Sequence, residues 1–271
     1  MPAFAAHYVF SREVYKKLSP DIKELIKKYK ESVDYYDLGA QGPDIFFFYK
    51  PYKKNNISSY GSSLHRKRAR NLFVNAIERV SKEEEWTREM LMVYLFGLCN
   101  HFTLDSCAHP IINKATKNFS EHMLLESELD RKVIHRYITR FRDKEHRYRR
   151  QYCINSTLKY GYYLNLVYPE IDVKKCQEAV YQTRFYMAKL YSPYFIKGAI
   201  IKTLSKKFAK GNDFSNMIIK KVPDTTFDKT NLALMNDWDK FIDIGVKNVT
   251  NLYEYYLGKA KLSEYFNKNF E

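Results

Sequence analysis

The sequence predicts an all-α protein, and three observations carry this prediction. Along most of the 271 residues, apolar residues recur at steps of three and four, as on the buried face of a helix. The chain has only 9 glycines and 8 prolines, which disfavours a turn-rich all-β fold. No stretch alternates apolar and polar residues as a half-buried strand does. With 45% hydrophobic residues and no internal repeat, we expect a single domain over residues 1–271.

Two helices are predicted near the N-terminus. Ser11 and Ser19 stand where helix N-caps belong, and Pro20 would take the first helical position after Ser19. Residues 35–62 then break the helical pattern with repeated Gly, Pro and Asn, so we expect one long loop there. The apolar cluster at residues 45–48 predicts that part of this loop packs inward.

Helical patterning returns at residues 64–80. Ser81 and Glu84 have the spacing of a capping box for the next helix. We expect Pro110 to end that helix, because proline disfavours a helical conformation of the residue before it. Another long helix is predicted from about residue 120 to beyond residue 150. The remaining expected elements are helices at about 153–166, 171–190, 194–208 and 229–257, and a loop at 211–226.

The formal net charge of +15 favours anionic partners such as a phospholipid surface, nucleic acid or a small phosphate ester. The excess lies almost entirely in residues 131–271. Within it, arginines interleaved with aromatic residues crowd the stretch 136–150. This stretch is interpreted either as an anion-binding face or as an ordinary solvated helix face, and the wider Lys excess has the same two interpretations.

The cysteines and the distribution of apolar residues exclude several classes. The 4 cysteines form no CxxC pair, which disfavours a zinc site of the cysteine type. The N-terminal residues lack the apolar stretch and cleavage site of a signal peptide. No run of eighteen apolar residues marks a membrane span. We therefore expect a cytoplasmic protein.

Histidines and carboxylates gather in one part of the chain at helical spacing. His101 and Asp105 are four residues apart, as are His122 and Glu126, and His109 follows Asp105 by four. Side chains four apart share one helix face, and imidazole with carboxylate is the ligand set that zinc takes when cysteine is absent. One such pair alone is more often a local hydrogen bond or surface ion pair. Here the flanking residues are apolar, and burial without a partner costs free energy, so we interpret the group as metal ligands.

Several segments resemble the motifs of the zinc-dependent phospholipase C family. Residues 101–110 resemble its central histidine and aspartate motif, and residues 38–47 resemble its aspartate loop around Asp44. Residues 122–130 resemble its last ligand pair. His7 and His65 stand where its first and second histidines belong. These motifs come in the family's order and cover about residues 1–135, whereas the basic remainder, 136–271, matches no motif.

The resemblance implies a multi-helix bundle with a cleft that holds two or three zinc ions. One ion would take Asp44, His65, His101 and Asp105. A second would take His109, His122 and Glu126. A third would take His7, a bridging Asp105 and the amino group and carbonyl of Pro2 after removal of Met1. The nuclease branch of the superfamily has its N-terminal residue five positions before the first histidine, as Pro2 stands here, but that residue is tryptophan in the family.

The function that this resemblance implies is hydrolysis of a phosphate ester bond by a hydroxide held between zinc ions. Asp44 would be a ligand and also the base that activates water, and Arg66 and Arg68 would contact the substrate phosphate. The expected substrate is a phospholipid or a related phosphodiester, met at an anionic membrane surface. We expect the protein to act as a monomer.

Two other functions remain open from the sequence. The same metal centre would serve a nuclease or nucleotidase, with nucleic acid as the less favoured partner. The second is a non-catalytic lipid- or protein-binding module whose metals only stabilise the fold.

Overall fold

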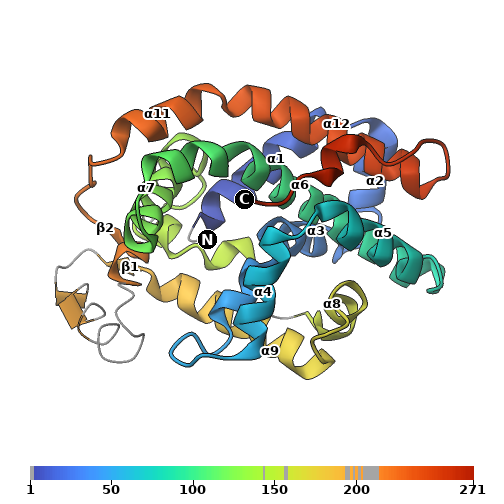
Figure 1. Ribbon diagram of the computed structural model, residues 1–271, viewed down its shortest axis with the longest axis horizontal. Helices are drawn as coiled ribbons and strands as arrows, with labels where there is room; N and C mark the ends of the chain where they lie inside the picture. The colour runs from blue at the N-terminus through green and yellow to red at the C-terminus, as the bar shows by residue number, and fades with distance from the viewer. Residues whose placement is uncertain are drawn as a thin grey trace.

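The all-α prediction is confirmed by the computed structural model (Figure 1). The structure describes residues 3–142, 144–155, 158–192, 196–197, 199–200, 203 and 214–271. Within these residues, the strands are β1 (Tyr191–Ser192) and β2 (Ile219–Lys220), which form one short parallel pair. In the same part of the chain, no helix combines the length and the apolar character needed to span a membrane.

The long helix α6 (Glu85–Ala115) runs through the centre of the fold. It is buried without interruption from Met90 to Ser106, which matches its apolar residues on every side. Helices from both ends of the chain surround it, and their bounds are α1 (Phe4–Lys17), α3 (Ser32–Gln41), α5 (Ala69–Val80) and α12 (Trp238–Tyr256). The His–Asp motif therefore lies inside the core rather than on the surface.

Two glycines let α3 and α6 touch through their backbones. A Cβ atom on Gly39 would lie 2.1 Å from the Tyr94 carbonyl oxygen, and one on Gly97 would lie 2.1 Å from the Tyr36 carbonyl oxygen. No side chain fits at either position, because the atoms in the way belong to rigid helical backbone. This close packing fixes the end of α3 against the middle of α6.

The prediction of one long loop over residues 35–62 is wrong. The chain there forms α3, then the 3-10 helix η1 (Gly42–Phe48), and then α4 (Asn56–Arg66). Gly39, one of the glycines behind the loop prediction, lies inside α3, where the packing against α6 requires it. The inward packing of residues 45–48 is confirmed, since three of these four residues are buried.

The predicted helix starts are partly correct. Ser19 precedes Pro20, the first residue of α2 (Pro20–Lys27), as expected, although its side chain makes no capping hydrogen bond. Ser11 lies inside α1 instead of at a cap, where its buried hydroxyl accepts a hydrogen bond from Asn100.

The capping box is absent. Ser81 follows the last residue of α5, and Glu84 precedes α6 without a side-chain capping bond. The single helical stretch predicted at 64–80 is divided between two helices, because α4 ends at Arg66 and α5 begins at Ala69.

Pro110 does not end α6, which continues to Ala115. A proline inside a helix removes one backbone hydrogen bond and strains the preceding turn. The extra turn is held nonetheless, because Ile112 is buried and its carbonyl accepts from the Thr116 N–H. The continuation keeps His109 on the same rigid helix as Asp105.

The helix expected to pass residue 150 ends much earlier, since α7 spans Phe119–Tyr137. Short 3-10 turns follow it, η2 (His146–Arg149) and η3 (Gln151–Cys153). Arg150 between them is fully buried, and its guanidinium donates to Asp130 Oδ2 at 2.8 Å. A continuous helix would separate these two residues by about 30 Å, so this buried ion pair requires the chain to turn back.

The other expected elements had mixed outcomes. The helix at 171–190 is confirmed as α9 (Val173–Lys189), whereas that at 153–166 begins only with α8 (Gly161–Val167). The pattern at 229–257 forms two helices, α11 (Asp228–Asn236) and α12. The expected loop at 211–226 contains η4 (Phe214–Met217) and β2, and most of the helix expected at 194–208 lies outside the described residues.

Candidate metal centre

The structure brings eight of the predicted ligands together from five elements. Three come from α6, two from α7, and one each from α1, η1 and α4. They form three groups in which the ligand atoms lie within 4.8 Å of one another: first Asp44, His65 and His101; second His7, His101 and Asp105; third His109, His122 and Glu126. The ninth predicted ligand, Pro2, lies outside the described residues.

The first group joins α4, η1 and α6. His65 Nε2 lies 3.0 Å from Asp44 Oδ1. His65 Nδ1 donates to the Gly61 carbonyl at 2.8 Å, and His101 Nδ1 donates to the Ala40 carbonyl at 3.1 Å. Because the Nδ1 atoms are used in this way, both rings turn Nε2 towards the centre of the group.

A glycine brings η1 close to His101. Gly42 has a φ of 52°, and a Cβ atom there would lie 2.6 Å from the His101 ring. Both the left-handed backbone and the ring contact require glycine. The turn places Asp44, two residues later, beside the histidines.

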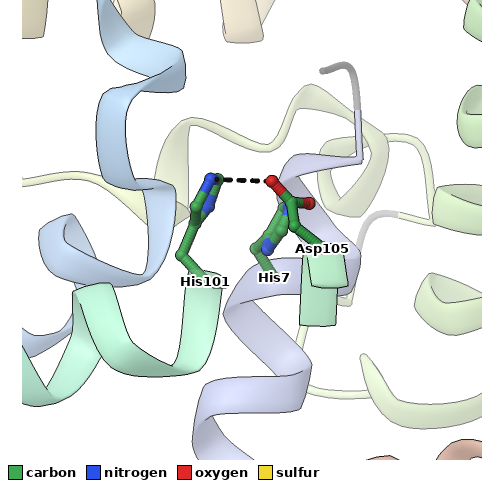
Figure 2. Close-up of side chains that lie close together, drawn as sticks. All are labelled: His7, His101 and Asp105. Carbon is green, nitrogen blue, oxygen red and sulfur yellow. Dashed lines mark ion pairs between the residues drawn. The ribbon is translucent and has the colours of Figure 1, made fainter. Parts of the chain in front are cut away.

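The second group joins α1 to α6 through Asp105, as Figure 2 shows. His7 Nε2 lies 3.3 Å from Asp105 Oδ1, and His101 Nε2 lies 3.2 Å from Asp105 Oδ2. The two imidazole rings stack with their centroids 4.1 Å apart. Oδ2 of Asp105 also lies 3.7 Å from His65 Nε2 of the first group, so the carboxylate contacts histidines of two groups, as the expected bridging role would require.

The third group joins α6 to α7. His109 Nε2 and His122 Nε2 lie 3.4 and 3.2 Å from Glu126 Oε1. His109 Nε2 also lies 3.8 Å from Asp105 Oδ1, so this group adjoins the second. His109 Nδ1 donates to the Phe270 carbonyl at 2.6 Å, a partner from the far end of the chain.

These separations fit zinc. Ligand atoms about 2.0–2.1 Å from a tetrahedral ion lie roughly 3.3 Å from one another. Five nitrogen–oxygen pairs within the three groups are 3.0–3.4 Å apart. In the described part of the chain, Nε2 of His65 and Nε2 of His101 are buried and find no aligned hydrogen-bond partner. Buried imidazole nitrogens without such a partner are costly unless a metal ion takes the lone pair.

The electrostatics of the centre keep its carboxylates ionised. Burial raises the pKa of Asp105, but His109, His101 and His7 together hold this pKa well below its usual value. Burial likewise opposes ionisation of Glu126, and His122 with His109 holds its pKa well below the usual value. For His109 itself, burial lowers the pKa, but Asp105 and Glu126 raise it to about 9. A metal ion would therefore displace a proton from His109 when it binds.

A cavity of about 930 Å³ opens beside the centre. Three of the ligands, His65, His109 and His122, line it, and the other five are not among the lining residues. The remaining lining is aromatic, polar and basic, and includes Phe47, Phe48, Tyr52, Lys53, Lys54, Ser58, Ser62, Asn113, Lys117, Phe119 and Glu271. Ligands from the first and third groups thus face a space large enough for a small organic phosphodiester.

The phosphate contacts of Arg66 and Arg68 stay a prediction. Arg66 and Arg68 are exposed and are not among the residues that line the cavity, and Arg66 donates instead to Ser62 Oγ. The lysines at the cavity rim carried no motif and were missed. Phe270 was missed as well, because a backbone carbonyl that acts from the far end of the chain leaves no sequence signal.

The comparisons with known proteins agree with this geometry. A family model described as zinc dependent phospholipase C matches residues 6–173, well over half of the chain and all eight clustered ligands. A search of curated proteins found no match, and neither did a search of solved structures. The chain belongs to the zinc-dependent phospholipase C family.

Proposed function

We propose that this protein hydrolyses a phospholipid or a related phosphodiester at a centre of two or three zinc ions. Membership of the family indicates a zinc-dependent hydrolase of the phospholipase C type. The observation that carries this proposal is the linkage of the three ligand groups beside one cavity. His101 belongs to two of the groups, Asp105 lies 3.8 Å from His109 of the third, and His65, His109 and His122 line the cavity.

The chain's own residues suit this chemistry. Zinc, when bound, lowers the pKa of water and offsets the negative charge that develops at phosphorus. Asp44 is buried, and although burial raises its pKa, His65 and His101 help to hold that pKa below the usual value. Asp44 lies 3.0 Å from His65, which lines the cavity, and an ionised carboxylate suits both a metal ligand and a proton acceptor for water.

The cavity supports a lipid substrate. Its wall near η1 is aromatic, with Phe47 and Phe48, and its rim carries Lys53, Lys54 and Lys117. Tyr52 is 62% exposed at the same rim, and Phe119 is 39% exposed. Aromatic side chains mixed with lysines are typical of surfaces that meet the headgroup region of a bilayer.

The test is an activity panel on zinc-loaded protein. We expect release of the phosphorylated headgroup and diacylglycerol from phospholipids, which is lost with a zinc chelator and restored by zinc. Replacement of a proposed ligand, His122→Gln, is expected to lower this activity, whereas His135→Gln on the exposed end of α7 leaves it unchanged.

Two results would contradict the proposal. Cleavage of single-stranded DNA without cleavage of lipid would assign the centre to a nuclease. Zinc that raises the melting temperature, with no turnover of any phosphodiester, would indicate a binding module.

A further inference from the structure

The C-terminal segment, residues 262–271, returns from α12 to the metal centre. Figure 1 shows its end in the middle of the molecule, and it contains the 3-10 helix η5 (Glu264–Asn267). This segment lies beyond residues 6–173, the part of the chain that the family model matches. Its contacts with the ligands are therefore not part of what the family match describes.

Phe270 contacts three ligand histidines. Its N–H donates to the His65 carbonyl at 3.0 Å, and its own carbonyl accepts from His109 Nδ1 at 2.6 Å. Its ring is fully buried, with centroid distances of 5.5 Å to the ring of His65 and 5.9 Å to that of His101. One residue thus touches ligands of all three groups.

Hydrogen bonds to the start of α5 hold the part of the segment that precedes Phe270. Arg70 donates from Nε to Asn267 Oδ1 at 2.7 Å and from Nη2 to the Leu262 carbonyl at 3.0 Å. The Ala69 N–H, at the start of α5, donates to the Lys268 carbonyl at 2.9 Å. These bonds satisfy a backbone donor at the start of a helix and leave the segment little freedom to move.

A metal-ligating histidine is oriented by the hydrogen bond of its other ring nitrogen. For His65 that partner is the Gly61 carbonyl of the same helix, α4, and for His101 it is the Ala40 carbonyl of α3. For His109 the partner is the Phe270 carbonyl. We propose that residues 262–271 position the metal ligands, with Phe270 holding His109 so that Nε2 faces the ion. This proposal rests on the zinc centre of the proposed function.

Phe266 supplies a matched control within the same segment. Like Phe270 it is fully buried, but its ring packs on Phe73 and Phe102, with centroid distances of 5.1 and 5.6 Å. Loss of either ring removes a similar apolar volume from the core. If the segment only packs, Phe270→Ala and Phe266→Ala will have the same consequences.

The experiment measures zinc affinity by competition with a fluorescent chelator, together with the melting temperature of the zinc-free proteins. We expect both variants to lower that melting temperature to a similar degree. Phe270→Ala keeps the carbonyl but removes the buried ring that packs on His65 and His101 and fixes the carbonyl in place. We expect it to weaken the binding of at least one zinc ion by about 10–100-fold, and Phe266→Ala by less than about threefold. Phe270→Met and Phe266→Met repeat the comparison with smaller packing defects, in case an alanine variant does not fold.

A second readout needs no variant. NMR of the histidine side-chain nitrogens in the zinc-loaded wild-type protein is expected to show the His109 proton on Nδ1. A proton on Nε2, or equal zinc affinity in the two phenylalanine variants, would overturn the positioning role. If the wild-type protein itself binds no zinc, the proposed function fails and not only this inference.

Discussion

At the scale of single residues, the ligands were predictable because helical spacing and motif order reveal them. His101 and Asp105 lie one turn apart on α6, and the structure places their side-chain atoms 3.2 Å apart. Phe270 could not be predicted, because it acts through a backbone carbonyl, which every residue carries. Arg66 and Arg68 are exposed and do not line the cavity, so their proposed contact with phosphate stays a prediction.

Asp105 is expected to matter more than any other ligand, because it belongs to the group with His7 and also adjoins His109. Asp105→Asn should lower phosphodiester hydrolysis by more than about 100-fold, since loss of even an outer partner costs 10–100-fold. It should also lower the number of bound zinc ions by more than His122→Gln does, as counted by native mass spectrometry. Equal zinc counts in the two variants would exclude a bridging Asp105.

The raised pKa of His109 predicts a pH dependence of the zinc-free fold. A folded-state pKa of about 9 exceeds the ordinary value of 6.5, so protonated His109 stabilises the fold at low pH. This contribution is fully present below about pH 6.5 and is lost as the pH rises through about 9. We therefore expect the difference in unfolding free energy between wild type and His109→Gln to shrink over that range.

The control for this pH effect is His135→Gln. Burial, with help from Arg147, lowers the pKa of His135, so its titration falls below the window of His109. Its free-energy difference from wild type, measured by urea unfolding, should stay flat above about pH 7. Parallel curves for the two variants would contradict the assignment to His109.

At the scale of helices and turns, the sequence indicates where helices are but not where they end. The sequence predicts that Pro110 ends α6, but the helix continues to Ala115 because Ile112 in the following turn is buried. Residues 35–62 are read as a loop, because the sequence cannot show that a glycine is there to admit another helix. The end of α7 depends on the Arg150–Asp130 pair, which is a contact of the folded chain.

The contact between α3 and α6 predicts a specific sensitivity. Gly97→Ala would place a methyl group 2.1 Å from the Tyr36 carbonyl oxygen, and rigid backbone must move to admit it. We expect a loss of at least about 1–3 kcal/mol in unfolding free energy and weaker zinc binding, because α3 carries the Ala40 carbonyl that orients His101.

Gly245→Ala on α12 is the comparison for that variant. The new methyl group would meet side-chain atoms of Val14 at 2.7 Å and of Phe10 at 3.2 Å, and no backbone atom is among its nearest contacts. The loss of stability should be smaller, and zinc affinity should not change. Similar effects of the two alanines on zinc affinity would contradict a role for the α3–α6 contact in the centre.

At the scale of the whole molecule, the net charge is a weaker guide than the arrangement of a few lysines. Part of the arginine-rich stretch folds inward, where Arg150 forms a buried ion pair. The basic residues beside the cavity, Lys53, Lys54 and Lys117, come instead from the first half of the chain. The single domain and the monomeric state stay predictions.

Under the proposed function, the rim lysines would contact an anionic membrane surface. The double change Lys53→Gln and Lys54→Gln should weaken binding to vesicles with anionic lipid by about 1 kcal/mol per lysine at low salt. The same change at Lys259 and Lys261, exposed in the turn after α12, should have little effect. Vesicle sedimentation measures both, and equal losses would place membrane contact elsewhere than at the cavity.

Zinc-dependent hydrolysis is tested most directly by titrating zinc into protein from which a chelator has removed the metal, with phospholipid hydrolysis as the readout. We predict no hydrolysis in the zinc-free protein and a return of activity that is complete at two or three zinc ions per chain. Hydrolysis that is independent of zinc, or a fully zinc-loaded protein that cleaves no phosphodiester, would contradict it.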